Sequence, residues 1–235
     1  MKLHRFYVNN IRDKNGKLTL NHELWVNNTK LLNQWLRVLR YKVGDELILF
    51  NDSHEKIYQI IKIEPPSSVK LLAVTELEKN IPKKNVILCW SLLKNDKNKL
   101  VIQKATEIGI KKFVPILTER CEKTVFDVER ARTIAIEASE QCGRFDIPTI
   151  TEPVFLKRAL ADYSDIKVYV CDTKEPGDYK DEKVDKTAVF IGPEGGWSDS
   201  ERELFNTQQV SFLRLGWFTL RAETACIAAA AKLLQ

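Results

Sequence analysis

The sequence reads IGPEGGWSDSE over residues 191–201 and LGWFTLRAETA over residues 215–225. Each stretch follows a short apolar run and leads into a segment with helical spacing, so each is predicted to be a corner between a strand and a helix. Corners of this kind hold ligands in α/β proteins, because the carboxyl ends of strands and the amino ends of helices meet there. Together the two stretches predict an α/β domain with a ligand site near the end of the chain.

The first corner has the features of a ligand-binding loop. Its three glycines permit positive φ values and let a bound molecule approach the backbone. Ser198 and Glu201 are spaced as a capping box, so unpaired amides of a helix start are expected beside the loop. The alternative is a tight turn that needs the glycines only for its own backbone. The loop is neither GxGxxG nor a Walker A sequence, which argues against a dinucleotide enzyme and a P-loop NTPase.

The rest of residues 80–235 alternates strand and helix patterns. Strands are predicted over residues 86–90, 113–117, 168–171, 188–191 and 212–215, and helices over residues 96–108, 129–142, 154–162, 198–207 and 222–234. This alternation predicts a mostly parallel sheet that is covered by helices on both faces. The last helix contains the run ACIAAAA, so it is either a buried core helix or a helix that approaches a partner subunit closely.

Residues 1–75 have a different pattern. Short strands are predicted over residues 3–8, 17–20, 45–50, 55–63 and 69–77, separated by turn sequences. One helix is predicted from an N-cap at Thr29, with an apolar face made by Leu31, Leu32, Trp35, Leu36 and Leu39. Many short strands with one helix predict a small β-barrel, a shape that often binds RNA. We therefore expect two domains, residues 1–75 and residues 80–235.

The positive charge of the chain is unevenly distributed. Residues 1–75 contain 12 Lys and Arg against 7 Asp and Glu, whereas residues 76–235 contain 25 of each. The whole surplus therefore lies in the first third of the chain. This asymmetry favours a polyanionic partner such as nucleic acid for that part, and the alternative is a solvated basic face.

Several classes of site and location are disfavoured. The five cysteines lack CxxC spacing, and His4, His22 and His54 all precede the α/β part, so no metal site, disulfide framework or Ser/His/Asp triad is expected. No apolar stretch approaches the roughly 18 to 20 residues of a membrane helix, and the first residues lack a signal-peptide core. We expect a cytoplasmic protein with no membrane partner.

A series of short motifs runs through nearly the whole chain. They are HRFYV (4–8), VLR (38–40), VGD (43–45), QKATEIG (103–109), IAIEASEQCGR (134–144), IGPEGG (191–196), LG (215–216) and LRAETA (220–225). In this order they resemble the SPOUT-class RNA methyltransferases that methylate N3 of a uridine in 16S ribosomal RNA. Each motif is weak alone, whereas the ordered set is specific.

The resemblance implies a PUA-like β-barrel followed by a SPOUT α/β domain whose C-terminal segment forms a trefoil knot, which general rules of chain connection would have rejected. It implies S-adenosylmethionine as cofactor, a homodimer that packs through the C-terminal helices, and 16S rRNA or the small ribosomal subunit as partner. The residues that it places around the cofactor are Ile191, Gly192, Pro193, Glu194, Gly195, Gly196, Leu215, Gly216, Leu220 and Thr224.

Methylation of uridine N3 requires that N3 lose its imino proton. Arg221 is expected to neutralise the negative charge that develops on the uracil oxygens. Glu194 or Glu223 is expected to take the proton, provided that it lies within hydrogen-bond reach of N3. The structural alternatives are that Glu223 caps the last helix and that Arg221 pairs with it.

The target base is expected to be flipped into the site while basic side chains hold nearby phosphates. These side chains are Arg5, Arg12, Lys14, Arg37, Arg40, Lys42 and Arg144.

Two positions depart from the family pattern. Gln34 stands where the family usually has His, and Trp217-Phe218-Thr219 stands where a basic residue is common. The rings of Trp217 and Phe218 are expected either to stack on a base or to pack in the core. Two other functions stay open: a non-catalytic RNA-binding factor with a degenerate SPOUT domain, and a SPOUT methyltransferase that acts on transfer RNA or on a ribose 2′-hydroxyl.

Overall fold

The computed structural model describes residues 3–9, 20–64, 68–94, 96–175, 177 and 184–235. The chain divides into two compact units. The first contains Met1–Ile81 together with Glu140–Asp146, and the second contains Pro82–Ser139 and Ile147–Gln235. The first unit therefore includes a short segment from the middle of the chain. The predicted domains, residues 1–75 and residues 80–235, put that segment in the second domain.

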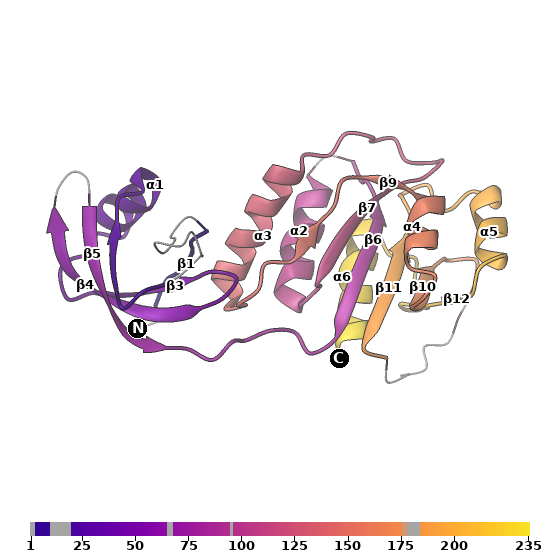
Figure 1. The fold of residues 1–235 in the computed structure, drawn as a ribbon. Helices are drawn as coiled ribbons and strands as arrows, with labels where there is room; N and C mark the ends of the chain where they lie inside the picture. The colour runs from indigo at the N-terminus through magenta and orange to yellow at the C-terminus, as the bar shows by residue number, and fades with distance from the viewer. Residues whose placement is uncertain (1–2, 10–19, 65–67, 95, 176, 178–183) are drawn as a thin grey trace. The chain divides into compact units, whose positions relative to one another are not determined.

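The first unit contains a five-stranded sheet and one helical segment (Figure 1). The sheet has the order β1-β3-β4-β5-β2, in which β1 pairs parallel with β3 and the other pairs are antiparallel. The strands are β1 (Arg5–Tyr7), β2 (Glu23–Val26), β3 (Glu46–Phe50), β4 (Glu55–Glu64) and β5 (Ser68–Glu76). The expectations did not include β2, and residues 17–19 of the strand expected over residues 17–20 lie outside the described residues. The part of the chain that the structure describes contains no closed barrel.

The helical segment of this unit begins and ends differently from the expectation. Asn28, not Thr29, is the N-cap of α1 (Thr29–Leu32), and its side-chain oxygen accepts a backbone amide of the helix at 3.1 Å. The chain continues as a π-helical turn, η1 (Asn33–Val38), a form that is rare because its ring of hydrogen bonds is wider than that of an α-helix. Trp35 on this turn still enters the core of the unit, so the apolar face is preserved.

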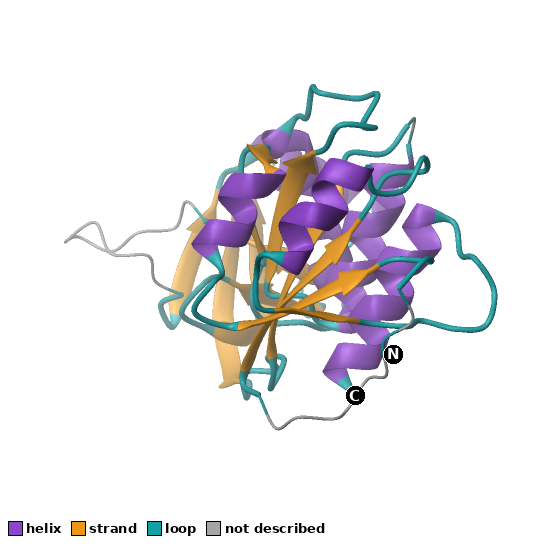
Figure 2. Ribbon diagram, turned by 90° about the vertical axis from the view of Figure 1, so that its right-hand side faces the viewer, coloured by secondary structure: helices purple, strands orange, loops and turns teal. Residues whose placement is uncertain are grey.

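The second unit is a parallel sheet with helices on both faces (Figures 1 and 2). Its order is β12-β10-β11-β6-β7-β8, with β9 also paired to β7, and every described pair is parallel. The strands are β6 (Asn85–Ser91), β7 (Lys112–Leu117), β8 (Thr149–Ile150), β9 (Val154–Phe155), β10 (Lys167–Cys171), β11 (Lys186–Ile191) and β12 (Val210–Phe212). The helices are α2 (Lys97–Ile108), α3 (Val128–Cys142), α4 (Leu156–Asp162), α5 (Asp199–Asn206) and α6 (Ala222–Leu234), and α3 ends within the segment Glu140–Asp146 of the first unit. The predicted α/β arrangement with a mostly parallel sheet is confirmed.

The central strands contribute to two separate hydrophobic cores, because successive side chains of a strand point to opposite faces. Leu88 and Trp90 of β6 belong to the core that includes residues of α2, α3 and α6. Ile87 and Cys89 of the same strand belong to the core that includes residues of α4 and α5. In Figure 1, α2 and α3 accordingly lie on one side of β6 and β7, and α4 and α5 lie on the other. Strands buried on both faces appear in the sequence as continuous apolar runs, which is why they could be predicted.

Two predicted elements are wrong in part. The segment 154–162 starts as the strand β9 and is helical only from Leu156, and the last strand ends at Phe212 instead of Leu215. α6 has the predicted bounds and packs against α2, β6 and β11, with Cys226 fully buried. The prediction of a core helix is therefore confirmed within the chain. In the parts of the chain that the structure covers, every helix is too short or too polar to cross a lipid bilayer.

Candidate functional site

Both glycine corners begin at the same edge of the parallel sheet. In the register of the sheet, Ile191 at the end of β11 lies beside Trp90 of β6 and Cys171 of β10. Val170 of β10 lies beside Phe212, the last residue of β12. The carboxyl ends of these four strands thus meet, and the two corners follow directly from them. This edge is where ligands of open α/β sheets bind.

The first corner is shaped by a close contact between backbone and an indole ring. A Cβ atom on Gly192 would lie 3.1 Å from Cε2 and 3.2 Å from Cδ2 of Trp197. The ring is held in place because its Nε1 donates to Cys171 O at 2.9 Å and because it packs edge-on against Phe205, with centroids 4.9 Å apart. Gly196 is the glycine of this loop with a positive φ, +67°. Gly192 is thus required for close approach, and Gly196 for backbone conformation.

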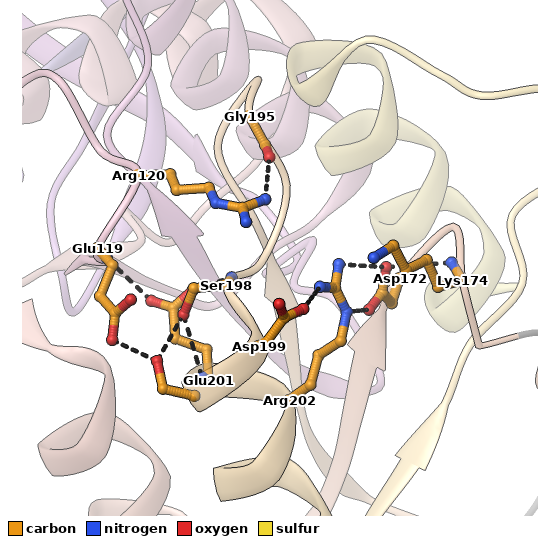
Figure 3. A network of polar contacts seen from close by, with 10 residues as sticks. Glu119, Arg120, Asp172, Lys174, Gly195, Ser198, Asp199, Glu201 and Arg202 are labelled. Carbon is orange, nitrogen blue, oxygen red and sulfur yellow. Dashed lines mark hydrogen bonds and ion pairs between the residues drawn. The ribbon is translucent and has the colours of Figure 1, made fainter.

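The helix start beside this loop is occupied by protein groups (Figure 3). The predicted capping box is present: Ser198 N donates to Glu201 Oε2 at 2.8 Å, and Glu201 N donates to Ser198 Oγ at 3.1 Å. Glu119 N, after β7, donates to Glu201 Oε1 at 3.0 Å, and Arg120 Nη1 donates to Gly195 O at 2.9 Å. The helix start therefore braces the loop. Sequence reasoning missed Arg120, because nothing in its local pattern relates it to residue 195.

Lys97, the first residue of α2, connects the two corners. Its Nζ lies 3.0 Å from Glu194 Oε1 in the first corner and 3.6 Å from Glu223 Oε2 in the first turn of α6. Lys94 N also donates to Glu194 Oε1, at 3.3 Å. Sequence reasoning missed Lys97 as well. The signal that could have found it is its place at a helix start that follows β6, on the carboxyl edge of the sheet.

The two glutamates that were candidate bases have different surroundings. Burial alone would raise the pKa of Glu194, but hydrogen bonds from Lys97 and from backbone amides outweigh it and hold that pKa below its usual value. A carboxylate with a lowered pKa is a weaker proton acceptor, so Glu194 is poorly suited to be the base. Glu223 is buried, its cation partner is Lys97, and among the described atoms its Oε2 accepts no hydrogen bond. The pairing of Glu223 with Arg221, which was the structural alternative, is not among the described ion pairs.

The second corner presents a cation and two aromatic rings to solvent. Trp217 and Phe218 are 85% and 86% exposed, so the alternative that they pack in the core is wrong. The guanidinium carbon of Arg214 lies 4.3 Å from the ring centroid of Trp217. Arg214 thus supplies a positive charge beside residues 217–219, where a basic residue was expected and this chain has Trp217, Phe218 and Thr219. Arg221 is the N-cap residue of α6 and is exposed. No described atom lies within 4 Å of a Cβ built on Gly216, so the backbone of this corner is open.

The other residues expected around the cofactor lie on the same two corners or on the helix start that follows. Ile191 and Pro193 are buried, Leu215 and Leu220 are half-buried, and Thr224 is exposed. The carboxyl edge of the sheet thus collects every residue that was expected to hold the cofactor.

Of the basic residues expected to hold phosphates, three are exposed, two are buried and two lie outside the described residues. Arg37, Arg40 and Lys42 are exposed in the first unit, close together in sequence, and Arg40 has a positive φ of +56°. Arg12 and Lys14 lie outside the described residues.

Arg5 and Arg144 have structural partners instead. They are 9% and 4% exposed. Arg5 Nε donates to Glu55 Oε1 at 2.9 Å and its Nη2 donates to Arg144 O at 3.3 Å, while Arg144 pairs with Asp146 at 2.8 Å. Their burial leaves no surface for a phosphate, so we correct the expectation and assign both arginines to the interior of the first unit.

Known proteins resemble this chain over nearly its whole length. Residues 79–234 match a family model described as the RNA methyltransferase domain. Ribosomal RNA small subunit methyltransferase E of Rickettsia conorii is 30% identical over 99% of this chain and 95% of its own length. The protein of the same name from Aquifex aeolicus is 32% identical over 81% of this chain and 86% of its own length.

Solved structures resemble the fold as well. A methyltransferase structure from Legionella pneumophila in complex with S-adenosylmethionine has a TM-score of 0.79 at 27% identity, and the match covers 99% of this chain and 97% of that one. The structure of a ribosomal RNA small subunit methyltransferase E from Neisseria gonorrhoeae, bound to S-adenosyl methionine, has a TM-score of 0.86 at 24% identity with the same coverage.

Proposed function

The chain belongs to the RNA methyltransferase family, and from this premise we propose that it methylates N3 of a uridine in 16S rRNA of the small ribosomal subunit, with S-adenosylmethionine as methyl donor. The observation that carries the proposal is the meeting of two glycine corners at one carboxyl edge of a parallel sheet. The names of the relatives support the ribosomal substrate, and the bound cofactor of a solved relative supports the donor.

The two corners fit this cofactor. No described atom lies within 4 Å of a Cβ built on Gly196 or Gly216, so the backbone at both corners is accessible to a bound molecule. Glu223 Oε2, which accepts no hydrogen bond from the described atoms and lies 3.6 Å from Lys97 Nζ, is a carboxylate oxygen in the same region. We propose that the backbone of residues 191–196 and 215–220, with Thr224, holds the cofactor, which supplies an activated methyl group on a sulfonium when bound.

The residues of this chain prepare the uridine. Arg221 neutralises the negative charge that spreads over the uracil oxygens as N3 loses its proton, a contribution that is typically worth about 10²–10³ in rate for one such donor. Glu223 remains the candidate for accepting that proton, because its Oε2 has no hydrogen bond among the described atoms. Glu194, held by Lys97, takes the role of a loop anchor.

We also propose the trefoil knot. After β12 the chain returns from the edge of the sheet to α6, which packs against β6 and β11. On the way, Leu213 N donates to Val170 O at 2.9 Å and Arg214 N donates to Gly177 O at 3.1 Å. The returning segment therefore runs against the connection that follows β10. A knot requires such a segment to pass beneath that connection, and these bonds support it.

The first unit is proposed to be the PUA-like RNA-binding domain, with Arg37, Arg40 and Lys42 on its RNA-binding surface. Its basic surplus and its predominance of β-structure support this role. A homodimer that packs through α6 is proposed as well, supported by the half-buried Ile227, Ala228 and Ala231 on that helix.

Mass spectrometry of 16S rRNA from a strain that lacks the gene tests the function. We expect one missing methyl group on a uracil base, restored by the wild-type gene but not by an Arg221→Ala variant. A missing 2′-O-methyl group or a change confined to transfer RNA would replace the proposed substrate. Intact rRNA methylation, together with no calorimetric binding of S-adenosylmethionine, would favour the non-catalytic RNA-binding factor.

A further inference from the structure

One lysine lies between the two walls of the proposed cofactor site. Lys97 Nζ is 3.0 Å from Glu194 Oε1 and 3.6 Å from Glu223 Oε2. The side chains of Lys97 and Glu194 are 29% and 31% exposed, whereas that of Glu223 is 11% exposed. The ion pairs thus join a partly solvated loop to a nearly buried helix start, across 126 positions of sequence from Lys97 to Glu223.

The backbone from which this lysine projects is held firmly. The next residue, Asn98, is buried, and its Oδ1 accepts from Trp90 Nε1 at 2.9 Å and from Leu93 N at 3.1 Å. Its Nδ2 donates to Leu93 O at 2.8 Å. One of these bonds ties the start of α2 to Trp90 of β6, and the other two tie it to Leu93 just after that strand. The backbone at Lys97 is thus held in place, and from it the ammonium reaches both carboxylates.

The carboxylates depend on that cation to different extents. Glu194 also accepts the backbone amide of Lys94, so it keeps a partner when the lysine is removed. Glu223 Oε2 has no hydrogen bond among the described atoms, and its ion-pair partner there is Lys97. A nearly buried carboxylate that loses its cation is destabilised unless it moves toward water. That movement would shift the start of α6 relative to the glycine loop.

We propose that Lys97 is a positioning residue that holds the glycine loop and the start of α6 in the placement that binds the cofactor. The inference rests on the proposed function in that the ligand is S-adenosylmethionine. It assigns no contact between Lys97 and that ligand: the lysine acts through Glu194 and Glu223.

A purely electrostatic role for Lys97 makes a different prediction. S-adenosylmethionine carries a sulfonium charge, so removal of a nearby lysine would by charge alone tighten its binding, because like charges repel. S-adenosylhomocysteine has a neutral sulfur and would respond less. A positioning role instead predicts that both molecules are weakened by a similar factor.

Isothermal titration calorimetry of both ligands, with the full chain, tests the proposal. For Lys97→Met we expect binding of each ligand to weaken by about tenfold, which corresponds to about 1.4 kcal/mol. Lys97→Arg should recover most of the affinity, since it restores the cation. Lys99→Met, on the same helix at an exposed position, is the matched control and should bind as the wild type does.

A second variant and a folding measurement separate positioning from loss of fold. Glu194→Gln should weaken the binding of both ligands. In the double variant with Lys97→Met, the loss of binding free energy should be clearly smaller than the sum of the two single losses, because both changes break one network. Circular dichroism should show each variant folded at the temperature of titration, and a variant that is unfolded there is titrated at a lower temperature.

The outcomes are distinct. Unchanged binding, or tighter binding of S-adenosylmethionine alone, in a folded Lys97→Met variant would overturn the positioning role and leave the proposed function intact. If the wild-type chain bound neither ligand, the proposed function would fail and the inference would fail with it.

Discussion

Replacement of Gly192 by alanine should destabilise the second unit by crowding one buried ring. The new methyl group would lie 3.1 Å, 3.2 Å and 3.4 Å from Cε2, Cδ2 and Nε1 of Trp197. These separations are shorter than those of ordinary carbon contacts, which are about 3.5–4.0 Å. The ring or the loop must therefore move by a few tenths of an ångström.

The ring has little room to move. Its Nε1 donates to Cys171 O at 2.9 Å, and the ring packs edge-on against Phe205 with centroids 4.9 Å apart. Overpacking of this kind typically costs about 1–3 kcal/mol. A loss of about 2 kcal/mol corresponds to a fall in Tm of roughly 4–8 °C for a chain of this size.

Thermal unfolding followed by circular dichroism measures this fall, with Gly216→Ala as the control. A Cβ at Gly216 meets no described atom within 4 Å, and its φ lies outside the positive range, so the control should stay within about 0.5 kcal/mol of the wild type. In a Trp197→Phe background the cost of Gly192→Ala should shrink, because the smaller ring leaves space. Equal Tm values for Gly192→Ala and Gly216→Ala would refute the idea that the indole is rigidly held.

Three further predictions concern chemistry, RNA and pH. Arg221→Ala should slow methylation by about 10²-fold or more with little change in cofactor affinity, as measured by transfer of a radioactive methyl group. A rate within twofold of the wild-type rate would exclude this role of Arg221. Arg158→Ala, in α4, is the control. Replacement of Arg37, Arg40 and Lys42 by alanine should weaken RNA binding and reduce the slope of log affinity against log salt concentration by about 1 per lost phosphate contact, whereas an unchanged slope would place the RNA elsewhere. Because the pKa of Glu194 is lowered, its carboxylate should stay ionised well below neutral pH. Cofactor affinity should therefore be constant from about pH 7.5 to pH 5. It should fall only as the pH drops below the ordinary glutamate pKa of about 4.3 toward the lowered pKa. A loss of affinity centred near pH 6.5 would contradict that assignment.

Elements with a strong local signal could be predicted from the sequence. β6 and β11 are apolar on both faces, so each appeared as a continuous run and was placed within two residues of its bounds. The capping box at Ser198 needs only two residues three positions apart, and its bonds are present. The two ligand corners followed from the same local rules, because a glycine-rich turn between a strand and a helix is recognisable in a short window.

Features that depend on distant parts of the chain could not be predicted in this way. β8 and β9 contain two residues each, too few to show any periodicity. The carboxylates of Glu194 and Glu223 meet Lys97 only after the sheet is assembled. Arg144 is expected on the surface because the character of a single residue does not reveal that it is buried and paired with Asp146.

Because the first unit includes the segment Glu140–Asp146, part of this unit is translated only after Pro82–Ser139 of the second unit. The ribosome makes Ile81 first and reaches Asp146 only 65 residues later, which takes roughly 3–13 s at about 5–20 residues per second. During that time Tyr7 N lacks Glu140 Oε1, its acceptor at 2.8 Å, and Arg5 Nη2 lacks Arg144 O. The nascent N-terminal unit therefore leaves the ribosome before its last hydrogen-bond partners exist. Its completion waits until Pro82–Ser139 of the second unit and the segment Glu140–Asp146 have been translated, so the first unit is still incomplete when its own N-terminal part has been made.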